Sequence, residues 1–305
     1  MLYHFNTFFY LINTNKKKLV NQISKYKTIF HDIQKNDNYI KFKNITNNTK
    51  MYKGLENCIF RKEENDLCLY HFFVPKKVVG KNRILIGPKR DGGYVLMDDF
   101  EKIKIAYSFG ISRDVSFDYA LAKKNINIYM YDHTINALPF YINKFHWKKI
   151  GLTGNKTENK KLQTLEEILS DNGHLNETNM ILKMDIEYSD WKSLLNISDE
   201  IIKKFKYILI EYHFRNEIKL YYKVLQKLQN THQVFYIHCN NCGRIISFGN
   251  NTICNALEVS YIIKEGNKFE KDDSIYPIPE FDFKNCFGPK LNFNLNLLKF
   301  FDLDN

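Results

Sequence analysis

The chain has 305 residues, of which 44% are hydrophobic, including 24 Phe and 20 Tyr. This composition excludes a globally disordered chain, and the length allows one large domain with an extension, or at most two domains. The formal net charge of +11 is dispersed along the chain without a basic helix or a recognised nucleic-acid-binding module, so we expect no nucleic-acid partner.

The six cysteines are sparse for a chain of this length, unlike the dense disulfide framework of a short secreted domain. Cys239 and Cys242 form a CxxC pair, with Cys254 beyond it, but no second CxxC completes a zinc site. Free thiols in a reducing compartment are therefore the expectation, with a structural zinc site as the alternative.

No run of the sequence reaches the ~20 apolar residues that a transmembrane helix needs. The aromatic segment 2–12 is interrupted by His, Asn and Thr, and the lysines at 16–18 follow it, the reverse of a signal peptide. We therefore expect a cytoplasmic protein without a membrane span. A membrane anchor through the aromatic segment is the alternative.

The first 75 residues are polar and rich in Asn and Lys. Apolar residues recur at helical spacing around 19–30, which predicts one or two helices followed by an irregular linker. The character changes at 83–86, a strand-like run that leads into the turn signal Asp-Gly-Gly at 91–93.

From there on, apolar strand patterns alternate with helical ones. The predicted strands are 103–109, 126–131, 147–152, 180–186, 206–210, 233–238 and 256–263, and the predicted helices are 115–124, 137–144, 165–170, 191–195 and 217–229. Strands separated by helices favour βαβ units and a parallel sheet. The segment 239–255 has no helical pattern, so we expect the last two strands to form an antiparallel hairpin, followed by an extended tail.

The first strand of this series leads into a candidate ligand-binding loop at Gly110. A glycine here lets the backbone approach a ligand, and the following helix offers free N–H groups. Asp132 ends the next strand, 22 residues after Gly110. This is close to the offset at which an acid binds a ribose hydroxyl in nucleotide-binding α/β folds. A plain β–α turn and a helix-capping aspartate are the alternatives, and His133 extends the same lip.

Polar side chains also follow two later strands. Asp185 and Glu187 end a buried apolar run, and Glu211 and His213 end the next strand. Ligands of open α/β sheets bind beyond the carboxyl ends of strands, and carboxylates are seldom buried unless paired. These residues could act as a general base, hold a divalent cation, or form a structural ion pair. Asn240, after the following strand, could line the same mouth.

Seven short segments carry a resemblance to a known family. They are Asp-Gly-Gly-Tyr-Val (91–95), Tyr-Ser-Phe-Gly-Ile (107–111), Ser-Phe-Asp (116–118), Tyr-Asp-His-Thr (131–134), Leu-Lys-Met-Asp-Ile-Glu (182–187), Ile-Glu-Tyr-His (210–213) and His-Cys-Asn-Asn-Cys (238–242). In this order they resemble the FkbM-related methyltransferase-like domain family, among the class I S-adenosylmethionine-dependent methyltransferases. Each segment is short, but the ordered set over about residues 80–263 is specific.

The resemblance implies a Rossmann-like α/β fold with a seven-stranded, mostly parallel sheet, a terminal antiparallel hairpin and helices on both faces. It implies S-adenosylmethionine bound by Gly110, Ile111, Ser112, Asp132, His133 and Asp185. In this arrangement Gly110 lies against the methionine moiety, Asp132 binds the ribose, and Asp185 lies near the methionine end and the acceptor. Two residues depart from the pattern: Ser112 stands where a second glycine is common, and Cys239 where the family often has glycine.

We therefore expect a methyltransferase-like domain at 76–264, an N-terminal extension at 1–75, and a tail at 265–305 packed on the domain. The expected reaction is methylation of a hydroxyl on a small molecule or glycan, with Asp185, Glu187 and His213 as catalytic residues. Glu187 or His213 would remove the hydroxyl proton. A divalent metal is compatible with the sequence but not required by it, and no metal ligand is assigned. The alternatives are a catalytically inert, methyltransferase-like binding protein and a nicotinamide-dependent oxidoreductase, which the missing GxGxxG disfavours.

Overall fold

The computed structural model describes residues 68–187, 189–248, 251–289, 291 and 295. The chain divides into two compact units, Met1–Asp66 with Gly249–Thr252, and Leu67–Phe248 with Ile253–Asn305. Of the first unit only residues 251 and 252 are described, so the predicted helical segment 19–30 and the aromatic segment 2–12 lie outside the described residues. Within the described ranges, none of the helices has both the length and the apolar character needed to cross a membrane.

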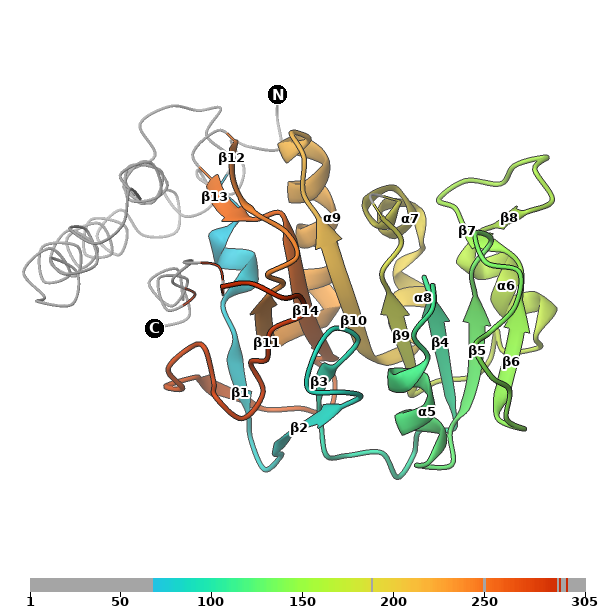
Figure 1. The fold of residues 1–305 in the computed structure, drawn as a ribbon, viewed down its shortest axis with the longest axis horizontal. Coiled ribbons are helices and arrows are strands. Elements are labelled where there is room, and N and C mark those ends of the chain that lie inside the picture. The colour runs from blue at the N-terminus through green and yellow to red at the C-terminus, as the bar shows by residue number, and fades with distance from the viewer. Residues whose placement is uncertain (1–67, 188, 249–250, 290, 292–294, 296–305) are drawn as a thin grey trace, which may run out of the picture. The chain divides into compact units, whose positions relative to one another are not determined.

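A seven-stranded sheet forms the core of the second unit (Figure 1). Its strand order is β11-β14-β10-β9-β4-β5-β6. The strands are β4 (Ile105–Phe109), β5 (Asn127–Tyr131), β6 (Phe145–Lys148), β9 (Met180–Met184), β10 (Phe205–His213), β11 (His232–Cys239) and β14 (Ala256–Ile263). Strands β10, β9, β4, β5 and β6 pair in parallel, whereas β14 is antiparallel to both of its neighbours. The predicted α/β class with a mostly parallel central sheet is confirmed.

The three central strands are buried along their whole lengths. Every residue of β4, β9 and β10 is buried, as is typical of parallel strands that are covered on both faces. Their sequences accordingly read as nearly continuous apolar runs, and the charged residues within them, Lys183, Lys206 and Glu211, stand out. Their burial requires specific polar partners.

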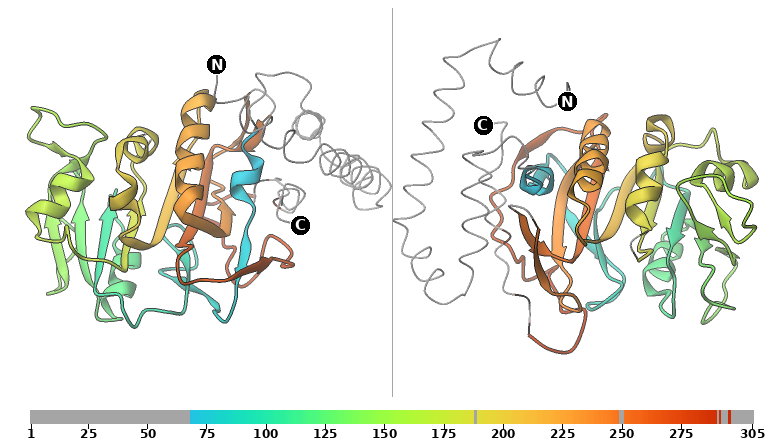
Figure 2. Two further views of the ribbon diagram at one scale, coloured as in Figure 1. Left: turned by 180° about the vertical axis from the view of Figure 1, so that it is seen from behind. Right: turned by 90° about the horizontal axis from the view of Figure 1, so that it is seen from above.

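The helices connect the strands of this sheet. They are α5 (Ser116–Ala122), α6 (Leu165–Asp171), α7 (Asp190–Asn196), α8 (Asp199–Ile202) and α9 (Ile218–Thr231), preceded by the short 3₁₀ helix η1 (Tyr70–Phe73). Figure 2 shows α6, α7 and α9 along one face of the sheet and α5 on the other. Helix α6 begins with a capping box, in which Thr164 and Glu167 satisfy each other's backbone N–H groups.

Short strand pairs lie around the main sheet. Strand β2 (Arg83–Ile86) pairs antiparallel with β3 (Tyr94–Met97), so the Asp-Gly-Gly signal does mark a turn. A Cβ atom on Gly93 would lie 2.1 Å from the carbonyl oxygen of Pro88, which explains why this position needs glycine. The remaining strands are β1 (Lys76–Val78), β7 (Gly151–Leu152), β8 (Leu162–Gln163), β12 (Ile245–Phe248), β13 (Asn251–Cys254) and β15 (Phe269–Lys271).

Two predicted elements differ from the structure. The predicted helix at 137–144 is wrong: the segment consists of turns and bends. Pro139 lacks the backbone N–H that a helix needs, and it disfavours helical geometry in the preceding residue. The predicted strand 147–152 is interrupted after β6, and its last two residues form β7, which pairs with β8 outside the main sheet.

The cysteines also differ from the expectation. Cys239 is bonded to Cys254 and Cys242 to Cys286, while Cys68 is buried. The expected free thiols are therefore wrong at four positions, and the CxxC pair does not form a zinc site because its two sulfurs bond to different partners. Disulfides persist in oxidising compartments, so reduced thiols no longer support the expectation of a cytoplasmic protein.

Candidate functional site

The candidate site lies where the strand order reverses. After β4 the chain adds β5 and β6 on one side, and it then returns to add β9 and β10 on the other. In open α/β sheets ligands bind at such a switch point, beyond the carboxyl ends of the strands. Gly110 follows β4 and Asp185 follows β9, so both residues lie at this point.

Gly110 is required by the close approach of these two strand ends. Its φ angle is +78°, and a Cβ atom at this position would lie 1.7 Å from the carbonyl oxygen of Asp185. Its amide donates a hydrogen bond to the carbonyl oxygen of Tyr131, and its own carbonyl accepts one from Nζ of Lys183 (2.7 Å). The glycine thus joins β4, β5 and β9 at the switch point.

Asp132, at the end of β5, is held by four hydrogen bonds from the protein itself. Its Oδ2 atom accepts from the amides of Ile111 (3.0 Å) and Ser112 (2.9 Å). Its Oδ1 atom accepts from the amide (2.8 Å) and hydroxyl (2.6 Å) of Thr134. A carboxylate has about four acceptor positions, so all of those on Asp132 are taken. The structure therefore brings Asp132 onto the glycine loop, where it acts as a structural tie.

The electrostatics of Asp132 agree with this geometry. Burial alone would raise the pKa of this carboxyl group, but the hydrogen bonds from Thr134, Ser112 and Ile111 outweigh it and hold the pKa below its usual value. His133, predicted on the same lip, is exposed, and a Cβ atom on Gly151 would lie 2.4 Å from its Nδ1 atom. His133 therefore packs against β7.

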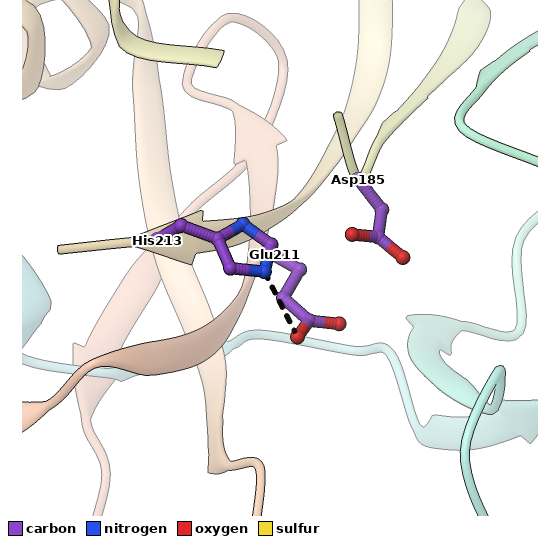
Figure 3. A group of neighbouring side chains, drawn as sticks. All are labelled: Asp185, Glu211 and His213. Carbon is purple, nitrogen blue, oxygen red and sulfur yellow. Dashed lines mark ion pairs between the residues drawn. The ribbon is translucent and has the colours of Figure 1, made fainter. Parts of the chain in front are cut away.

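A second group of polar side chains lies on the other side of the switch point. Glu211 and His213 are two residues apart on β10 and share one face of the sheet. Nε2 of His213 lies 3.6 Å from Oε1 of Glu211 and 3.6 Å from Oε2 of Glu187. Figure 3 shows Glu211 and His213 extending from β10 toward Asp185, which follows β9. The structure thus brings together the three predicted catalytic residues.

Further carboxylates crowd this group. Glu258 on β14 lies directly opposite Glu211 in the antiparallel register, and Asp91 from the β2–β3 turn completes the set. We call Asp91, Asp185, Glu211 and Glu258 the carboxylate cluster. Like charges directly opposite each other on paired strands are destabilising. Burial raises the pKa of Glu211 well above its usual value, and the other three members of the cluster add to the effect.

Amide and imidazole groups support the far side of the carboxylate cluster. Nδ2 of Asn240 donates to Glu211 (3.0 Å), and Nδ2 of Asn285 donates to Glu258 (2.7 Å) and Asp91 (3.1 Å). Nε2 of His238 bonds to Oδ1 of Asn285 (2.7 Å), and its Nδ1 bonds to Asp282. Both ring nitrogens therefore donate, which requires the cationic form of this histidine.

The pKa values in this part of the site follow from the same contacts. Burial opposes the charged form of His238, but the charge of Glu258 and the hydrogen bond to Asp282 outweigh it and raise its pKa to about 9. Burial raises the pKa of Glu258 to about 7, although cationic His238 and Asn285 oppose the shift. His238 is thus a cation that lies beside several acidic side chains.

Lys183 and Tyr94 were missed by the sequence reasoning. Nζ of Lys183 lies 3.8 Å from Oδ2 of Asp185 and binds the carbonyl of Gly110, so this lysine links the glycine loop to the carboxylate cluster. Tyr94 on β3 is 4% exposed, and its ring lies 5.9 Å from the Lys183 ammonium. A lysine inside an otherwise apolar strand was the available signal. Tyr94 lay within the Asp-Gly-Gly-Tyr-Val motif without an assigned role.

The start of α7 positions His213. The indole Nε1 of Trp191 donates to the carbonyl oxygen of His213 (3.0 Å), and Asp190 is fully buried beside the backbone of the same residue. Burial raises the pKa of Asp190 to about 8. Glu187, just before this helix, has a φ of +46° and a side chain that is 75% exposed. Ser189 is the N-cap residue, but its side chain makes no capping hydrogen bond.

Two groups of predicted residues therefore meet at the switch point: the loop of Gly110, Ile111, Ser112 and Asp132, and the group of Asp185, Glu187 and His213. Lys183 contacts both groups. A comparison with known proteins adds no family to this picture, because the chain matches no protein-family model and no curated protein.

Proposed function

We propose that this protein is an S-adenosylmethionine-dependent methyltransferase with a Rossmann-like fold, which methylates a hydroxyl on a small molecule or glycan. The observation that carries the proposal is the switch point between β4 and β9, with a glycine loop on one side and an acid-lined edge on the other. The reversed strand β14, inserted between β10 and β11, supports the seven-stranded arrangement with a terminal antiparallel pair that the sequence resemblance implies.

The loop residues fit the cofactor only with one adjustment. Asp132 has no acceptor position left for a ribose hydroxyl, so one of its four hydrogen bonds must give way. The hydroxyl of Thr134 is the exchangeable donor, because a side-chain rotation releases it while the backbone donors stay fixed. Asp185 fits a polar cofactor group directly, since its side chain is 31% exposed and faces the switch point.

The cofactor would supply a methyl group bonded to a sulfonium centre. Methyl transfer forms a carbon–oxygen bond to the acceptor as the carbon–sulfur bond breaks in line, so the protein contributes mainly proximity and alignment. His213 and Glu187, 3.6 Å apart, are the groups that take the hydroxyl proton. Trp191 holds the backbone of His213 in place for this role.

Ligand-induced thermal stabilisation tests the proposal. S-adenosylmethionine and S-adenosylhomocysteine are expected to raise the melting temperature of the full chain, and NAD is expected to leave it unchanged. Stabilisation by NAD alone would support the oxidoreductase instead. Gly110→Ala is expected to abolish the shift, because its Cβ atom meets the Asp185 backbone. Gly80→Ala is the matched control, since Gly80 has a similar φ of +74° but nothing within 4 Å of the added atom.

The role of Asp132 can be separated from the integrity of the loop. Thr134→Val removes one hydroxyl from Oδ1 and leaves the three backbone hydrogen bonds. If Asp132 accepts a ribose hydroxyl, this variant retains or improves cofactor affinity in calorimetry, because the competing donor is gone. A clear loss of affinity contradicts the ribose contact.

A catalytically inert, methyltransferase-like binding protein is the second candidate. The observation in its favour is that Asp132 is saturated by the protein's own donors. Release of S-adenosylhomocysteine from S-adenosylmethionine in the presence of pooled small hydroxylated compounds and glycans distinguishes the two. Cofactor binding without any release across such a pool would favour the inert protein.

A further inference from the structure

The carboxylate cluster and His213 have the geometry of a cation site. One ligand atom from each of Asp185, Glu211 and His213 lies within 4.8 Å of the other two. For metal–ligand bonds of about 2.1 Å, neighbouring ligand atoms of an octahedral ion lie about 3 Å apart and opposite ones about 4 Å. Nε2 of His213 and Oε1 of Glu211 are 3.6 Å apart, and the side chain of Asp185, which is 31% exposed, lies beside Glu211 (Figure 3).

The charges of these residues are not balanced within the described part of the chain. Glu211 shares a second group of three with Asp91 and Glu258, so four carboxylates surround one region. Two cations lie beside them: Lys183, 3.8 Å from Asp185, and His238, which is the partner of Glu258 in the β11–β14 register. Lys183 also donates a hydrogen bond to the carbonyl oxygen of Gly110, and His238 is hydrogen-bonded to Asp282. Buried carboxylates without equivalent positive charge are costly, and a bound cation would remove that cost.

Tyr94 provides an independent observation. Tyr94 is 4% exposed, and its hydroxyl forms no hydrogen bond with any residue that the structure describes. Its ring lies 5.9 Å from the ammonium of Lys183, which is itself 3.8 Å from Oδ2 of Asp185, so Tyr94 lies beside the carboxylate cluster. A buried phenol usually finds a hydrogen-bond partner. Here the natural partner is a ligand, or its bound water, between the hydroxyl and the carboxylates.

We propose that Asp185, Glu211 and His213 bind one divalent transition-metal ion, of the Mn²⁺ or Zn²⁺ class, at the carboxyl ends of β9 and β10. One imidazole combined with carboxylates selects this class over Mg²⁺ and Ca²⁺, which prefer oxygen ligands alone. Asp91 and Glu258 add negative charge behind Glu211, and Tyr94 bonds to a water on the ion. This site shares Asp185 and His213 with the proposed methyl transfer, and with His213 on the ion the hydroxyl proton passes to Glu187. Its test is metal binding, which requires neither cofactor nor turnover.

Metal titration of the full chain tests the proposal. Protein stripped with a chelator is titrated with MnCl₂, and free Mn²⁺ is followed by its electron paramagnetic resonance signal. Wild-type protein is expected to bind one Mn²⁺ per chain, and Zn²⁺ is expected to displace it. Glu211→Gln is expected to weaken binding at least about tenfold, which is about 1.4 kcal/mol. The control is Glu270→Gln, a more than half-exposed glutamate 3.5 Å from Lys77, which should leave affinity unchanged.

A second variant keeps the proposal testable if Glu211→Gln fails to fold. His213→Asn retains a polar side chain but removes the imidazole, so the preference for Mn²⁺ over Mg²⁺ is expected to fall. A purely structural His213 would not alter that preference. The proposal is overturned if wild-type protein binds neither Mn²⁺ nor Zn²⁺. It is also overturned if Glu211→Gln and Glu270→Gln bind equally well, or if His213→Asn keeps the metal preference of the wild type.

Discussion

Asp132 and Glu211 are both buried carboxylates at the same edge of one sheet, yet their surroundings are opposite. Asp132 receives hydrogen bonds from three backbone amides and one hydroxyl, which lower its pKa. Glu211 receives one from Asn240 and lies among three other carboxylates, and its pKa is raised. A carboxylate saturated by fixed donors becomes part of the scaffold, whereas one that lacks donors is stabilised only by a proton or a cation.

The largest expected effect concerns the segment that covers the carboxylate cluster. The Cys242–Cys286 disulfide closes a separation of 44 residues and holds Asn285 on Glu258 and Asp91. Replacing both cysteines by serine should lower the free energy of unfolding by about 4 kcal/mol, against about 3 kcal/mol for the 15-residue Cys239–Cys254 pair. Chemical denaturation measures both costs.

Hydrogen exchange localises this effect. Amides of residues 281–286 should lose protection in the Cys242→Ser/Cys286→Ser variant, while those of Ile111 and Ser112 keep it, because Asp132 holds them independently of the disulfide. Equal loss of protection in both regions would contradict this difference, since it would show that the two regions unfold as one cooperative unit.

The next largest effect on the free energy of unfolding is expected at Asp132, which acts as the structural tie of the glycine loop. Asp132→Ala leaves the amides of Ile111, Ser112 and Thr134 without their acceptor, so we expect a loss of about 3 kcal/mol in the free energy of unfolding. Urea denaturation measures the change. Asp273→Ala, at an exposed aspartate on the same protein, should stay within about 0.5 kcal/mol of the wild type. A comparably small cost at Asp132 would contradict its role as a tie.

The two regions should also respond to pH with opposite sign. Glu258 has a folded pKa of about 7, above its unfolded value, so the folded state keeps a proton that the unfolded chain has lost. Its contribution is therefore fully present below the unfolded pKa and is lost as pH rises through the folded pKa, by about 3 kcal/mol in metal-free protein. Asp132, with a lowered pKa, contributes above its unfolded pKa and loses that contribution in acid.

Denaturation of metal-free protein between pH 4 and 8 measures these slopes. The Glu258→Gln variant should lack part of the fall in stability on the neutral side, where Glu211 and Asp190 also contribute, and the Asp132→Asn variant should lack part of the fall on the acid side. An unchanged profile in Glu258→Gln would show that this carboxyl group does not titrate between these limits.

Much of the fold could be predicted from local patterns. Buried runs such as 180–184 mark strands of the parallel sheet, and their ends place Asp185, Glu211 and His213 at one edge because parallel neighbours share a direction. Pro139 is a local signal too, and giving it more weight than the apolar spacing around it would have excluded the wrong helix at 137–144.

The rest depends on contacts between distant parts of the chain. Glu258 belongs to the carboxylate cluster only because β14 inserts between β10 and β11 in one particular register, and a shift of one residue would turn it to the other face. The same pairing brings Cys239 near Cys254. The saturation of Asp132 follows from the path of the loop at Ile111 and Ser112, which spacing alone does not reveal.

The smallest expected effect is also the sharpest test of the comparison. In metal-free protein at alkaline pH, where Glu211 is ionised, Glu211→Gln removes a charge opposite Glu258 and keeps an oxygen acceptor for Asn240, so it should stabilise the fold by about 1 kcal/mol. Asp132→Asn, the same chemical change at the other carboxylate, should destabilise it, because the amide offers a donor where Ile111 or Thr134 needs an acceptor. Thermal unfolding in the presence of a chelator measures both changes.

Adding Mn²⁺ should then make the wild type more stable than Glu211→Gln, because the wild type gains stability from the bound ion and the variant does not. If both substitutions destabilise the metal-free protein equally, the two carboxylates are alike and the distinction between tie and ligand fails.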